Sequence, residues 1–275
     1  MWPTAIFVLL SASPVAACCG PRNCTHVAVG QPLLSFDSTN FHVKSTVAGC
    51  DARSVAQCCE SWRQYLSTRW LGDEKPSAWD PRCTVIVHAR REAYRAAIGR
   101  GGEQSFGSSW IDFQSGRITT RRIDLLVDSR GVISALGHEL THLVIADAFP
   151  GVQPPIWANE GVALLADPPA KQQLHRRDLD QSLRSQTGYH SAELLQTATY
   201  PRPERLGAFY AQSASLTTFL VELGGSEKFV PFVKRSNEVG YDQALADTYG
   251  IGDVAELHRR WRAGAQHSQL AGADR

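Results

Sequence analysis

The chain has 275 residues, of which 43% are hydrophobic, so it is long enough and apolar enough to bury a core and to form one or two domains. Its formal net charge of +1 excludes the strongly basic surface typical of nucleic-acid-binding proteins, and we expect no nucleic-acid partner. The sequence shows no internal repeat and no low-complexity tract.

Residues 1–17 are predicted to be an export signal, because residues 5–17 form an apolar run that is too short to span a bilayer. Residues 15–18 are similar to a bacterial lipobox, in which a lipidated Cys18 would become the mature N-terminus and attach the protein to a membrane. The same residues also suit ordinary signal peptidase. No Lys or Arg precedes Arg22, which is unusual for either kind of signal. We expect a periplasmic or cell-surface protein, with or without a lipid anchor.

The cysteines are concentrated near the N-terminus. All seven lie in the first third of the chain, at positions 18, 19, 24, 50, 58, 59 and 83. If Cys18 is lipidated, the remaining six could form up to three disulfides, which agrees with an oxidising compartment. Reduced thiols in a cytosolic protein are the alternative. A second zinc site is disfavoured, because no two cysteines have the two-residue gap typical of such sites.

Residues 36–130 are predicted to form an α/β subdomain, which follows an N-terminal linker at 18–35. Alternating apolar residues and turn signals predict the following elements in chain order: a strand at 40–46, a helix at 52–71, a strand at 83–88, a short helix at 92–98, a hairpin at 108–119 that turns at 114–116, and a strand at 122–128.

His138-Glu139-Leu140-Thr141-His142 follows this last strand. On a helix the two histidines lie one turn apart on one face, where both imidazoles can bind one metal ion. Glu139 lies close enough to act on a water at the metal without being a ligand. Residues 131 and 149–151 suggest the start and the end of this helix. An apolar stripe on it includes Asp147 as an exception.

A second helix is predicted after Pro154 and Pro155, and it contains Asn159-Glu160-Gly161. Glu160 has Ala, Gly, Val and Leu as neighbours, so its carboxylate is expected to be buried and to need a cation. Zinc would supply that cation, and a buried ion pair with an arginine is the alternative. Two histidines, one glutamate and an open position make a known catalytic zinc site, so we expect one zinc ion. Asp167 is a candidate to orient His138.

These motifs, with a third block that runs from Phe209-Tyr210 to Lys228-Phe229, resemble the gluzincin metallopeptidases and, more narrowly, the peptidase MA-like family. The resemblance covers residues 35–265. It implies that Tyr210 donates a hydrogen bond to the developing oxyanion, whereas a packing role is the alternative. The aminopeptidase motif Gly-x-Met-Glu-Asn is absent, so cleavage at free N-termini is not supported. Leu164 replaces a carboxylate of related enzymes that usually orients a zinc histidine, so that partner is not identified by the resemblance.

Residues 131–268 are expected to form a mainly helical subdomain that carries the zinc site. Its further helices are predicted at 169–185, 209–223, 226–236, 239–248 and 253–265. The fold class is therefore α+β and zincin-like: a mixed α/β half with a small sheet, a mainly helical half, and the active-site cleft between them. His190 is expected in a loop, where it could contact substrate.

The predicted function is an exported zinc metallopeptidase, expected to be an endopeptidase, or else a hydrolase of another amide. Glu139 would be the general base that moves a proton from water to the leaving amine. Its partner would be a peptide or protein substrate, whose backbone pairs with an edge strand at 123–127. The principal alternative is a catalytically silent zincin-fold module that binds envelope proteins. A structural lipoprotein with an accidental motif is a third.

Overall fold

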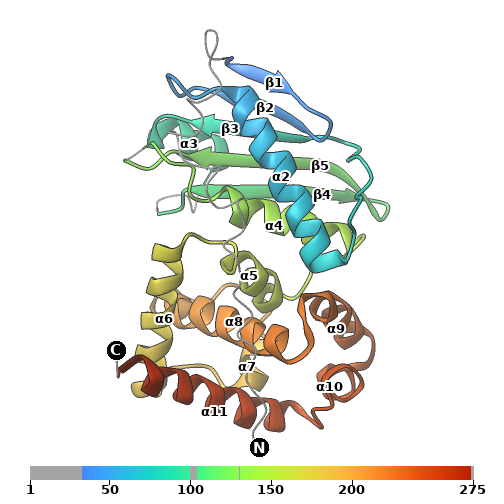
Figure 1. Cartoon of the computed structure of the whole chain (residues 1–275), viewed down its shortest axis with the longest axis vertical. Coiled ribbons are helices and arrows are strands. Elements are labelled where there is room, and N and C mark those ends of the chain that lie inside the picture. Colours follow the sequence, from blue (N-terminus) through green and yellow to red (C-terminus); the bar gives the residue numbers. More distant parts are fainter. Residues whose placement is uncertain (1–32, 100–103, 130, 274–275) are drawn as a thin grey trace, which may run out of the picture.

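The structure is a computed structural model that describes residues 33–99, 104–129 and 131–273, with side chains as far as residue 265. The predicted export signal, Cys18 and most of the linker lie outside the described residues. Figure 1 shows a sheet with its helices in one half of the molecule and a group of helices in the other. The α+β class predicted from the sequence is confirmed. None of the described helices is both long and apolar enough to cross a membrane.

The sheet has five strands in the order β1-β2-β3-β5-β4. They are β1 (Ser35–Asp37), β2 (Phe41–Ser45), β3 (Cys83–His88), β4 (Gly107–Gln114) and β5 (Arg117–Leu126). The three inner strands are parallel, whereas β1 and β4 pair antiparallel to their neighbours. β4 is therefore an edge strand that runs against the direction of the inner strands.

One prediction about the sheet is wrong. The segment 123–127 was expected to be an edge that could receive substrate, but residues 123–126 belong to β5, which has β3 on one side and β4 on the other. The hairpin and the following strand are also continuous, because β5 extends from Arg117 to Leu126 after a turn at Ser115 and Gly116. The free edge on this side of the sheet is β4.

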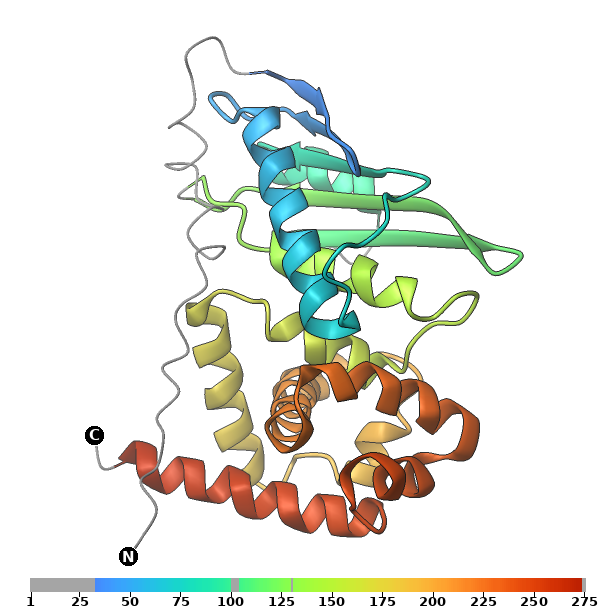
Figure 2. The same ribbon diagram turned by 45° about the vertical axis from the view of Figure 1, so that its right-hand side comes forward.

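Helices cover both faces of the sheet. α2 (Ala52–Leu71) and α4 (Leu136–Asp147) pack against each other on one face, and α3 (Arg91–Ile98) contacts β3 and β5 on the other (Figure 2). The apolar side chains Val85, Val87 and Ile123 are buried in the sheet. α2 begins at the predicted residue because Asp51 caps it by accepting a hydrogen bond from the Ser54 N–H.

The metal-motif helix is shorter than predicted. The apolar residues Val132 and Ile133 precede α4 instead of belonging to it. Gly131 has a φ of +73°, and the Asp128 carboxylate accepts a hydrogen bond from the Val132 N–H, so a turn replaces the first helical residues. Asp147, the exception in the apolar stripe, accepts hydrogen bonds from Arg121 and Trp79. It is therefore paired rather than merely tolerated at the helix end.

The other half is entirely helical. It comprises α5 (Ile156–Leu164), α6 (Pro169–Arg184), α7 (Ser191–Leu195), α8 (Pro203–Gly224), α9 (Ser226–Val239), α10 (Tyr241–Tyr249) and α11 (Val254–Ala273). α8 starts six residues before its predicted first residue, and the short α7 was not predicted. Trp70 and Trp157 both pack edge-on against Phe229, with ring centroids 6.0 and 5.9 Å apart. One hydrophobic core therefore continues from the sheet half into the helical half.

The described cysteines do not form disulfides with one another. Cys59 and Cys83 are free thiols with no exposed surface. Burial raises the pKa of both thiols, which keeps them protonated. Three disulfides would require all six remaining cysteines, so the upper limit of that prediction is not reached.

Candidate metal centre

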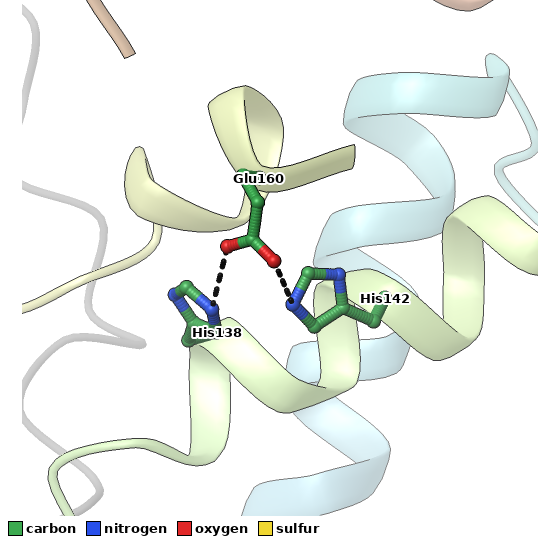
Figure 3. A group of neighbouring side chains, drawn as sticks. All are labelled: His138, His142 and Glu160. Atoms are coloured by element: carbon green, nitrogen blue, oxygen red, sulfur yellow. Dashed lines mark ion pairs between the residues drawn. The ribbon is translucent and has the colours of Figure 1, made fainter. Parts of the chain in front are cut away.

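α4 presents His138 and His142 on one face, one helical turn apart, and their ring centroids are 4.8 Å apart. Both side chains are mostly buried, with 15% and 11% of their surface exposed. Figure 3 shows both rings turned towards the same carboxylate on the next helix. The structure therefore places the two imidazoles on one face of α4, as the helical spacing predicts.

That carboxylate is Glu160 of α5. Its Oε2 lies 3.6 Å from His138 Nε2, and its Oε1 lies 3.9 Å from His142 Nε2. One ligand atom from each of the three residues lies within 4.8 Å of the other two. Two imidazole nitrogens and one carboxylate oxygen form the donor set of a catalytic zinc site, so the residues fit this ion.

The alternative partner for Glu160 is not found. Within the described part of the chain, its carboxylate forms ion pairs with the two histidines and with no lysine or arginine. Only 4% of the residue is exposed. A buried carboxylate without a fixed cation is costly, so this arrangement favours a bound cation between the three side chains.

Gly161 explains how α5 brings Glu160 to this position. A Cβ atom at residue 161 would lie 2.1 Å from Thr217 Oγ1 and 2.8 Å from the Ser213 carbonyl oxygen on α8. Only glycine permits α5 and α8 to approach this closely. Trp157 lies on the same helix with no exposed surface and donates a hydrogen bond to the Tyr241 hydroxyl, so it is a core residue.

Asp167 is the acidic neighbour of His138. Its Oδ1 lies 3.4 Å from His138 Nδ1, which is longer than a well-formed hydrogen bond and is best described as an ion pair. His175 and Lys171 of α6 lie 3.6 and 3.5 Å from the same carboxylate. The sequence-based candidate for orienting His138 is therefore in place.

The charges of this centre shift its pKa values. Burial opposes protonation of His138, but Asp167 and Glu160 outweigh it and raise the pKa of His138 to about 10. Burial likewise opposes ionisation of Glu160, but the two histidines and Tyr200 lower its pKa to about 2. Burial also opposes ionisation of Asp167, but His138 and His175 outweigh it and hold the pKa of Asp167 well below its ordinary value. The metal-free centre therefore holds a proton on His138 between two carboxylates.

Tyr200 was missed by the sequence analysis. It lies in the loop between α7 and α8, and its hydroxyl donates a hydrogen bond of 2.5 Å to Glu160 Oε1. Burial and the Glu160 charge raise the pKa of Tyr200, so the hydroxyl keeps its proton. Tyr200 and Glu160 are 40 residues apart, and no helical or strand spacing in the sequence connects them.

Glu139 and Tyr210 complete the centre. Glu139 is buried and lines the cleft, and a Cβ atom at Gly107 of β4 would lie 2.6 Å from its Oε1. Tyr210 lies in the middle of α8, not at a helix start, and also lines the cleft. Burial raises the pKa of Tyr210, and the charges of Glu160 and Glu139 raise it further, so these two carboxylates lie near its hydroxyl.

A cleft of about 680 Å³ surrounds these side chains. It is bordered by β4 and α4 on one side and by α5, α6, α8 and the α7–α8 loop on the other. This volume is in the range of sites that hold a small ligand or a few residues of a peptide. His190 is not among the lining residues: it precedes α7, and its ring packs 3.9 Å from that of His258. The expectation that it could contact substrate is not supported.

A comparison with known protein families identifies one family for this chain. The family model described as Peptidase MA superfamily matches residues 102–266, which is more than half of the chain. The match includes both histidines, Glu139, Glu160 and both tyrosines. No curated protein matches the chain.

Proposed function

The chain belongs to the peptidase MA superfamily as a gluzincin-type member, and from this premise we propose that it is a zinc-dependent endopeptidase. The observation that carries the proposal is the convergence of His138, His142 and Glu160, whose donor atoms lie within 4.8 Å of one another. These three residues would hold one zinc ion. Membership of the family supports a peptidase with a peptide or protein substrate.

A zinc ion held by these residues would act as a Lewis acid, polarising the scissile carbonyl and acidifying the attacking water. Glu139 is the proposed general base, and its carboxylate takes the proton from that water and passes it to the leaving nitrogen. The close approach of β4 at Gly107 leaves little space beside Glu139 Oε1 and so restricts where this carboxylate can point. Glu139 contributes no donor atom to the cluster of three, which leaves it available for proton transfer.

The tyrosines are proposed to act as hydrogen-bond donors. Burial and nearby carboxylates raise the pKa of Tyr210, so its phenol stays protonated and can donate to an oxyanion that develops in the cleft. Tyr200 has a different position, since its hydroxyl already donates to Glu160 Oε1. Its proposed role is to orient the Glu160 carboxylate.

The substrate backbone is proposed to pair with β4 instead of the 123–127 segment. The Leu126 N–H donates to the Phe106 carbonyl, so alternate residues from Phe106 onward point their backbone groups at β5. The backbone groups of Gly107, Ser109 and Ile111 then point away from β5. A peptide in extended conformation can add to this edge beside the metal centre.

Export remains part of the proposal. Its support is the apolar run at 5–17 and the concentration of cysteines in the first third of the chain. Attachment to a membrane through a lipidated Cys18 is proposed on the lipobox-like residues 15–18. Mass spectrometry of the mature N-terminus would test both, because a diacylated Cys18 supports the anchor and an uncleaved Met1 contradicts export.

The function is tested by peptide cleavage with purified, zinc-loaded protein and a mixture of unmodified peptides. We expect cleavage at internal bonds, loss of cleavage after chelation, and recovery when one equivalent of zinc is added back. A protein that binds zinc but cleaves no peptide or protein substrate would instead support the catalytically silent alternative.

A further inference from the structure

Exposed apolar side chains border the cleft on both sides. Eight large apolar residues are exposed in the described part of the chain, and three of them line the cleft. These are Trp110 on β4, Leu174 on α6 and Tyr200 in the α7–α8 loop, which are 62%, 52% and 55% exposed. Exposed apolar surface in a cleft marks a site where a partner buries it. The three residues come from both sides of the cleft.

The position of Trp110 on the edge strand relates it to a bound peptide. Gly107 lies on the face of β4 that contacts Glu139, so residues 108 and 110 lie on the other face. A peptide that pairs with β4 places every second side chain on that face. The side chain opposite Trp110 would lie within contact distance of the indole.

The acidic residues that line the cleft are buried. Glu139, Glu160 and Asp167 are each less than 8% exposed, and all three lie at the metal centre. The described lining residues include no exposed carboxylate that could pair with a cationic substrate side chain. Lys171, with 40% of its side chain exposed, would repel such a side chain. Bringing an unpaired lysine or arginine into this cleft therefore carries a desolvation cost without a compensating ion pair.

We propose that this peptidase selects substrates with large apolar or aromatic side chains at the positions that face Trp110 and Leu174, and that it discriminates against lysine and arginine at these positions. This inference rests on the proposed function, because it defines the substrate class of the same site. Tyr200 also borders this surface, but its contact with Glu160 makes it unsuitable for testing specificity.

The first experiment measures kcat/KM for a set of quenched fluorescent peptides that differ at one residue within three positions of the scissile bond. We expect Phe and Leu peptides to be cleaved at least about tenfold better than Lys and Arg peptides. Trp110→Ala and Leu174→Ala are expected to reduce that preference several-fold by lowering kcat/KM for the apolar peptides. Leu223→Ala is the matched control, because Leu223 is a helical leucine with 47% exposure that does not line the cleft.

The second experiment measures peptide binding without turnover. Zinc-loaded Glu139→Gln protein keeps the three proposed ligands. Fluorescence anisotropy of labelled peptides should show that it binds Phe and Leu peptides more tightly than Lys and Arg peptides. Equal binding of Phe and Lys peptides would overturn the proposed specificity. An unchanged preference for apolar peptides in both Trp110→Ala and Leu174→Ala would overturn it as well. If wild-type protein selects apolar peptides in binding but cleaves none, the peptidase proposal fails while this inference stands.

Discussion

The two sides of the cleft supply their functional groups in different ways. α4 provides His138, Glu139 and His142 from five consecutive residues, and helical geometry alone fixes their relative positions. The helical half provides Glu160, Asp167, Tyr200 and Tyr210 from separate segments that only tertiary packing brings together. The first set is therefore readable from the sequence and locally robust, whereas the second depends on how α5, α6 and α8 pack.

The largest expected effect is on the α4 side. Glu139→Gln removes the proposed base but none of the proposed ligands, so kcat should fall by about 10²–10⁴-fold while zinc content and melting temperature stay unchanged. Steady-state kinetics and elemental analysis of the same preparation measure both properties. An active variant would remove Glu139 from the mechanism.

The packing of the opposite side is tested at Gly161. Gly161→Ala would force α5 away from α8, because the new Cβ meets Thr217 Oγ1 and a backbone oxygen, and we expect a loss of about 1–3 kcal/mol in unfolding free energy together with weaker zinc binding. Denaturant unfolding of the zinc-loaded and metal-free forms measures this.

Gly207→Ala on α8 is the matched control for that substitution. A Cβ atom at residue 207 would meet Asp178 Oδ2 at an ordinary 3.5 Å, so this variant should be as stable as wild type or slightly more stable. Equal effects of the two substitutions would show that the α5–α8 approach is not what positions Glu160.

Asp167 connects the two sides through His138. Asp167→Asn removes the charge that faces His138 Nδ1 and should weaken zinc binding by about 10–100-fold, as is usual for groups that orient a metal ligand. Asp178→Asn on α6, outside the cleft, is the control. Chelator competition measures both zinc affinities, and an unchanged affinity for Asp167→Asn would limit the role of Asp167 to its ion pairs with Lys171 and His175.

A smaller effect follows from the pKa of His138. Because this pKa is about 10 in the metal-free protein, the imidazole is protonated at neutral pH and must lose its proton to bind zinc. Zinc affinity should therefore fall about tenfold per pH unit as the pH is lowered from roughly 9 to 7. Affinity that is independent of pH over this range would show that His138 is already neutral.

The same pKa predicts how the metal-free fold responds to pH. A folded-state pKa of about 10 for His138, against an ordinary pKa of 6.5, adds stability that is complete below pH 6.5 and is lost as the pH rises towards 10. The depressed pKa of Glu160, about 2 against 4.5, acts in the opposite direction, so its contribution is lost in acid. Both contributions predict a stability maximum between these limits, which thermal unfolding across pH would reveal.

The sequence-based predictions succeeded where the signals are local and failed where tertiary packing decides. The bounds of α2 and β3 were predicted because capping, apolar periodicity and turn signals are local. The start of α4 was misplaced because Val132 and Ile133 continue the apolar pattern, whereas Gly131 and Asp128 form a turn there. No local pattern distinguishes an inner strand from an edge, so the 123–127 segment was given the role that β4 has in the sheet.

In the site, the sequence identified the residues whose types define a known donor set, and it left Tyr200 unnoticed. A tyrosine in a loop carries no periodicity, and its hydrogen bond to Glu160 exists only once α5 and α8 are packed. Trp110 and Leu174, which line the cleft, were missed for a related reason, because exposure within a cleft is a property of the folded chain.

The central claim is that side chains from two helices together bind one metal ion, and zinc stoichiometry tests it most directly. We expect one zinc per chain in wild-type protein, and less than about one-tenth of that in His138→Ala and in Glu160→Ala after dialysis against a weak chelator. Full zinc occupancy in the Glu160→Ala variant would contradict the account, because the helical half would then contribute no ligand.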